Sequence, residues 1–90
     1  MSIKIDIPSY LQSFTNNMAA VEVSGSTVGE CISHLVAQFS GIEKMLFAES
    51  GKLHAYVGIC INGEDTYPEE LAKPVKDGDE LYIFYIIGGG

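Results

Sequence analysis

The chain has 90 residues, enough for one domain with a modest core, and 47% of them are apolar, which argues against disorder. It carries 12 acidic residues and five lysines, for a net charge of −7, which disfavours nucleic acid and anionic membrane surfaces as partners and favours a basic protein. No apolar run approaches the roughly 20 residues of a membrane-spanning helix, and residues 1–6 lack the pattern of a signal peptide, so we expect a cytoplasmic protein.

The first third of the chain is expected to form two strands. Residues 3–8 alternate apolar and polar side chains and end at a proline, which is the pattern of a half-buried strand. A second strand is expected at about residues 18–23, with Val21 and Val23 on one face.

One main helix should follow. Thr27 and Glu30 fit a capping box, in which each side chain satisfies a backbone amide of the first turn. Ser40-Gly41 is expected to end the helix. Apolar residues then recur at helical spacing and form one stripe: Val28, Cys31, Ile32, Leu35, Val36 and Phe39.

The second half alternates short elements with turns. Residues 42–47 should form a helical turn over the core, and residues 56–61 a third strand. Asn62-Gly63 predicts a tight turn into a short edge strand at residues 64–67. A helical turn is expected at residues 68–71, with Pro68 in its first turn.

Residues 81–87 are the most apolar segment and predict a last strand beyond a turn at residues 76–79. The first and last strands are apolar enough to be central, and they can pair in parallel through a right-handed crossover. We therefore expect an α+β domain over residues 1–87, a β-grasp (ubiquitin-like) fold with a mixed sheet of four or five strands packed on one main helix.

Gly88, Gly89 and Gly90 follow the last strand and have no side chains to anchor them. They predict a flexible tail that could thread a narrow channel in a partner. A frayed terminus is the alternative, but a fray normally follows a polar boundary and this tail follows an apolar strand.

The order of elements, the turn Lys76-Asp77-Gly78-Asp79 into the last strand, and the terminal Gly89-Gly90 resemble the ubiquitin-like small sulfur carrier proteins (the MoaD/ThiS-like family). The likeness covers nearly the whole chain. Ser40-Gly41-Ile42 and Asn62-Gly63-Glu64-Asp65 are closest to the mycobacterial cysteine-pathway branch. The family usually has a proline before the tail, where this chain has Tyr85-Ile86.

The resemblance implies a protein cosubstrate that is not itself an enzyme and binds no cofactor. A ubiquitin-activating-type adenylyltransferase would consume ATP to adenylate Gly90, and a sulfur donor would convert it to a thiocarboxylate. A sulfur-accepting synthase would be the second partner, in cysteine or homocysteine synthesis first and molybdopterin synthesis next. A metal-dependent peptidase is a further candidate partner.

Two other functions stay open. A ubiquitin-like modifier would join Gly90 to lysines of target proteins, and a plain interaction module would make no use of its tail. The sequence contains no nucleophile–base pair, metal cluster or phosphate loop that would indicate catalysis by the chain itself.

Strand alternation places Tyr56, Cys60, Tyr82 and Phe84 on the sheet face away from the helix. An exposed apolar patch there would be a docking site for a partner, although loops or self-association could also cover it. Cys60 could carry a persulfide or thioester, but packing within the sheet is the simpler interpretation.

The remaining candidates have plain explanations. His34 and His54 are isolated and are expected to be structural or solvated, Cys31 to lie in the core, and no disulfide is expected in a cytosolic chain. An acidic group could steer a basic partner or could simply be a solvated edge: Glu64, Asp65, Glu69 and Glu70.

Overall fold

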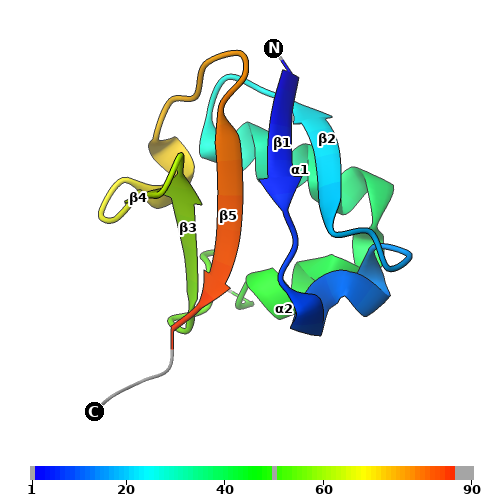
Figure 1. The fold of residues 1–90 in the computed structure, drawn as a ribbon. Helices are drawn as coiled ribbons and strands as arrows, with labels where there is room; N and C mark the ends of the chain where they lie inside the picture. The colour runs from blue at the N-terminus through cyan, green and yellow to red at the C-terminus, as the bar shows by residue number, and fades with distance from the viewer. Residues whose placement is uncertain (1, 50, 87–90) are drawn as a thin grey trace.

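The fold is known from a computed structural model that describes residues 2–49 and 51–86 (Figure 1). Three short 3-10 turns lie at residues 9–14, 40–42 and 70–72. Within the described ranges, no helix is long and apolar enough to cross a membrane. The helices and strands are β1 (Ser2–Asp6), β2 (Ala20–Ser24), α1 (Val28–Gln38), α2 (Glu43–Leu46), β3 (Val57–Ile61), β4 (Glu64–Asp65) and β5 (Glu80–Tyr85).

The five strands form one mixed sheet in the order β2-β1-β5-β3-β4. The first and last strands are central and parallel, with Ile5 opposite Leu81, and the other pairs are antiparallel. β5 therefore lies between β1 and β3 along the middle of the sheet (Figure 1). This arrangement confirms the predicted α+β, β-grasp fold.

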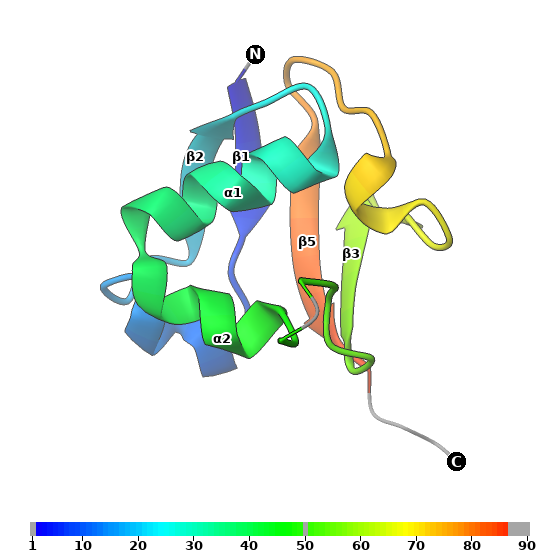
Figure 2. The same cartoon turned by 180° about the vertical axis from the view of Figure 1, so that it is seen from behind.

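Both helices cover the same face of the sheet (Figure 2), and the other face, seen in Figure 1, is open. The core lies between the two layers and is built from the alternate strand residues that face α1, such as Ile3, Ile5, Ile59 and Leu81, all at most 1% exposed. The predicted helical stripe supplies the opposite side, from Val28, Cys31, Ile32 and Leu35, with Val36 and Phe39 partly buried.

The ends of α1 differ in detail from the prediction. The Thr27 hydroxyl accepts a hydrogen bond from the Glu30 amide at 3.1 Å, as expected of an N-cap. The Glu30 carboxylate, however, accepts from the amide and hydroxyl of Ser26, both at 2.8 Å, instead of from Thr27. The helix ends at Gln38, and Gly41 does not take the left-handed conformation of a glycine cap.

Other boundaries also shift. The edge strand β4 has two residues instead of four, and the helical turn that follows begins at Glu70, so Pro68 lies outside it. Asn62 (φ 51°) and Gly63 (φ 88°) form the predicted tight turn. The last strand ends at Tyr85.

Candidate functional site

Three of the four predicted docking residues meet on the open face. Cys60 in β3 lies directly opposite Tyr82 in β5, and Gly58 lies opposite Phe84. Tyr82 is 41% exposed, whereas Cys60 and Phe84 are half-buried. We call Gly58, Cys60, Tyr82 and Phe84 the open-face patch. These residues lie on β3 and β5, next to each other in the sheet (Figure 1).

The patch depends on a close contact between its two strands. A Cβ atom on Gly58 would overlap with the Cζ atom of the Phe84 ring and would lie 2.8 Å from its Cε1 atom. Gly58 is buried although it lies on the open face, because the Phe84 ring covers it. The absence of a side chain at residue 58 therefore sets the position of the ring.

The surroundings of Cys60 favour packing over chemistry. Its thiol is free and half-buried. Burial raises the pKa of this thiol, and the negative charge of Asp65 raises it further. Since the thiolate is the reactive form, both effects disfavour a nucleophilic role. Cys31 is also free and lies in the core, as predicted.

Tyr56 belongs to a different group from the one expected. Its ring lies 5.3 Å from that of Tyr85, and the Tyr85 ring lies 5.5 Å from that of Tyr10 in an edge-on arrangement. We call Tyr10, Tyr56 and Tyr85 the tyrosine cluster. All three are 39–52% exposed, and the Ile86 amide donates to the Tyr56 carbonyl at 2.7 Å. The cluster thus surrounds the end of the last strand.

The two histidines have structural partners, as predicted. The Nδ1 atom of His34 accepts from the Ser24 amide at 2.8 Å and joins α1 to β2. The His54 ring stacks on Tyr56, with centroids 4.7 Å apart and planes 10° from parallel. Its Nε2 atom lies 3.0 Å from the Lys44 carbonyl oxygen.

Charged side chains border the patch along β1 and β5. Lys4 and Glu80 are paired in register, and their Nζ and Oε2 atoms lie 3.5 Å apart. Burial raises the pKa of Asp6, and the neighbouring Glu80 raises it further. A hydrogen bond from Asp6 lowers the pKa of Glu80, and the contact of Tyr82 with Glu80 raises the pKa of that phenol. The carboxyl groups of Asp6 and Glu80 and the Lys4 ammonium therefore lie together beside the aromatic rings.

Gly88, Gly89 and Gly90, the predicted tail and acyl site, lie outside the described residues. Among residues 2–49 and 51–86, no group of three His, Cys, Asp or Glu side chains is placed to hold a metal ion. The edge acids Glu64 and Asp65 are exposed, and their steering role stays a prediction.

Comparison with known proteins adds to this geometry. The ThiS family profile matches residues 5–90. The sulfur carrier protein CysO of Mycobacterium tuberculosis is 39% identical over 93 residues that span all of both chains. Its crystal structure superposes with a TM-score of 0.87 at 38% identity, over 94% of this chain and 99% of CysO.

Two further solved structures have the same fold. A CysO chain from Amycolatopsis orientalis, crystallised in a BexX/CysO complex, matches with a TM-score of 0.87 at 35% identity, over 98% of this chain and 99% of that one. SAMP1 from Haloferax volcanii matches with a TM-score of 0.85 at 26% identity over the whole of both chains. The CysO chains and SAMP1 therefore share this architecture.

Proposed function

The chain belongs to the ThiS family, and on that premise we propose that it is a sulfur carrier whose Gly90 is converted to a thiocarboxylate. The observation that carries the proposal is the family match, which extends through residue 90 on a chain that also aligns over its full length with CysO. A chain of this kind is a small carrier protein and not an enzyme.

The chemistry starts from an unreactive group, because a carboxylate is a poor electrophile. A partner adenylyltransferase would transfer AMP from ATP to the Gly90 carboxylate and release pyrophosphate. Hydrosulfide or its equivalent from a sulfur donor would then displace AMP and leave the thiocarboxylate. A tail of glycines suits this route because it can pass where side chains cannot.

Two surfaces of the body would position the tail. The open-face patch offers apolar area for docking, with the tyrosine cluster at the end of the strand that leads toward Gly90. Aromatic side chains are well suited to such contacts because they bury a large area at low entropic cost. The acidic surface would favour a partner with a basic face.

The likeness to CysO favours cysteine or homocysteine synthesis as the destination of the sulfur, with molybdopterin synthesis second. The partners would then be an adenylyltransferase and a sulfur-accepting synthase, with a metal-dependent peptidase as a further candidate, all in the cytoplasm. ATP would be consumed by the activating partner and not held by this chain.

Intact-mass measurement of the protein purified from its native host tests the proposal. We expect the mass gain of one oxygen exchanged for one sulfur, located on the last residue by tandem fragmentation. A variant with an alanine appended after Gly90 is the matched control, since it keeps the folded body and blocks the reacting carboxylate. Sulfur on the appended variant, or none on the native chain under sulfur-replete growth, would contradict the proposal.

The structural match to SAMP1 favours a second candidate, a protein modifier, because SAMP1 stands for small archaeal modifier protein 1. The same preparation separates the two functions. Lysine conjugates that retain Gly90 in an isopeptide bond, without a thiocarboxylate form, would establish the modifier.

A further inference from the structure

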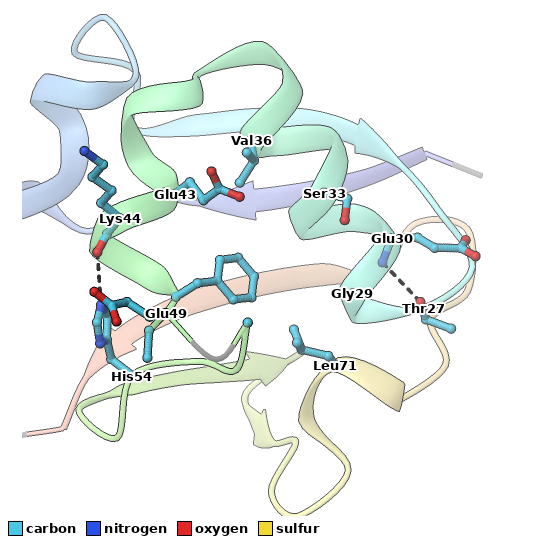
Figure 3. Close-up of a pocket in the computed structure, with 13 residues that line it drawn as sticks. Thr27, Gly29, Glu30, Ser33, Val36, Glu43, Lys44, Glu49, His54 and Leu71 are labelled. Carbon is cyan, nitrogen blue, oxygen red and sulfur yellow. Dashed lines mark hydrogen bonds between the residues drawn. The ribbon is translucent and has the colours of Figure 1, made fainter.

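A groove of about 1190 Å³ lies on the helix side of the molecule, away from the open-face patch (Figure 3). Its walls come from α1, α2, residues 47–49, 51 and 54, and the 3-10 turn Glu70–Ala72. Val36, Phe47 and Leu71 are its partly buried apolar residues. The groove therefore has an apolar floor that no described segment of the chain covers.

Backbone contacts hold one wall in place. The Val28 amide donates to the Lys73 carbonyl at 2.9 Å, which ties the start of α1 to the segment that carries Leu71. A Cβ atom on Gly29 would lie only 3.0 Å from the Leu71 carbonyl oxygen. This close approach shows that the wall is already packed, so an occupant would meet a preformed surface.

The rim of the groove is acidic. Glu43 and Glu49 are exposed, and the ion pairs of the described part of the chain, Lys4–Glu80 and Lys73–Glu69, include neither. The side chain of Lys44 points away from the groove (Figure 3), and its carbonyl oxygen is the atom that contacts His54. Two carboxylates are thus available to a cation beside an apolar floor.

We propose that this groove binds a cationic, amphipathic segment of a partner protein. The segment would place apolar side chains on Val36, Phe47 and Leu71, and lysine or arginine side chains against Glu43 and Glu49. A second copy of the chain is a poor occupant, because both copies carry a net charge of −7. The groove lies apart from the open-face patch, so a partner could occupy it while another engages that patch.

One end of the groove reaches the tyrosine cluster. His54 lines the groove and stacks on Tyr56, and the Tyr56 ring in turn packs against Tyr85 in β5. An occupant at this end would therefore contact His54, which is linked to the last strand through the ring of Tyr56.

The test is an amide-NMR titration of the full chain at physiological ionic strength with a synthetic peptide of alternating leucine and lysine. We expect saturable shifts centred on Ser33, Val36, Phe47 and Leu71. The same peptide with glutamate in place of lysine should not bind. Reversing both rim charges with Glu43→Lys/Glu49→Lys should weaken binding at least about tenfold.

The matched control is Glu22→Lys/Glu64→Lys, which makes the same change in net charge outside the groove and should weaken binding by less than about threefold. Ser33→Trp, on the exposed side of α1, should block the groove, whereas Ser33→Ala should not. Shifts spread evenly over the acidic surface or centred on the open-face patch, or equal losses in the two charge-reversed variants, would overturn the proposal. If the parent chain binds the peptide at the groove and Glu43→Lys/Glu49→Lys still forms the thiocarboxylate normally, groove binding is supported as a function separate from the chemistry of Gly90.

Discussion

The ring of Phe84 in β5 occupies the space that a side chain on Gly58 in β3 would fill. The two residues are paired in register, and the contact covers the middle of the open face. Glycine is thus required at residue 58 by a close approach and not by its backbone angle, since Gly58 does not have a positive φ.

Gly58→Ala should destabilise the fold by about 1–3 kcal/mol, because the new methyl group would force the Phe84 ring to move. Urea denaturation measures the loss. Gly41→Ala is the matched control, since its nearest neighbour would be 3.4 Å away. Combining Gly58→Ala with Phe84→Leu should recover part of the stability, and a double variant no better than Gly58→Ala alone would argue against the ring as the cause.

Tyr82→Ala should reduce activation of Gly90 by the adenylyltransferase about tenfold, chiefly through KM, which corresponds to roughly 1.4 kcal/mol of binding energy. Steady-state release of pyrophosphate measures the effect. Tyr67→Ala is the control, because Tyr67 is 74% exposed and lies outside the open-face patch. Equal kinetics for the two variants would remove the patch from the docking surface.

Cys60→Ser should leave thiocarboxylate formation at saturating partner unchanged, so that any effect of this open-face substitution appears in KM and not in kcat. The raised pKa and the partial burial of the thiol also predict that iodoacetamide modifies Cys60 more slowly at neutral pH than it modifies a free cysteine. Mass spectrometry of timed samples measures that rate. Loss of sulfur transfer at saturating partner in the serine variant would instead indicate that the thiol takes part in the chemistry.

Asp6→Asn should change how stability depends on pH. The pKa of Asp6 is raised above its usual 3.8, so between that value and its folded value the folded chain holds more protons than the unfolded chain. This term makes the free energy of unfolding fall as pH rises through that window. Glu80, whose pKa is lowered below its usual 4.5, contributes in the opposite direction.

The variant lacks the Asp6 term, so its stability relative to the parent chain should increase as pH rises from about 3.8 toward neutrality. Urea denaturation at several pH values between those limits measures the difference, with Glu64→Gln as a control outside the pair. A constant difference across the range would mean that Asp6 titrates normally in the folded chain.

Periodicity explains why the fold could be predicted from sequence. Alternation in β1 and β5 and the 3.6-residue spacing in α1 each place their apolar residues on one face, and packing the helix on the sheet buries both faces. The pairing of Cys60 with Tyr82 follows from the same alternation, because both strands are regular at that point.

The tyrosine cluster was not predicted, and strand alternation explains the failure. Alternation assigns Tyr85 to the same side as Leu81 and Ile83, but the strand ends there and the ring remains 52% exposed. Tyr10 comes from a 3-10 turn with no periodic pattern. The aromatic contacts depend on where three chain segments end in space, which no local pattern encodes.

The groove was also beyond sequence reasoning. Its apolar residues, Val36, Phe47 and Leu71, belong to three separate segments, and each taken alone is an ordinary core residue. The approach of Leu71 to Gly29 is a tertiary contact between residues 42 positions apart.

The parallel pairing of the first and last strands has a consequence for biosynthesis. β5 is the last strand to be synthesised, and until it exists the gap between β1 and β3 in the sheet cannot close. A nascent chain that stops before residue 80 would therefore lack the central strand of its sheet, and proteases could remove it. Completion of the sheet thus reports that translation has passed through the last strand.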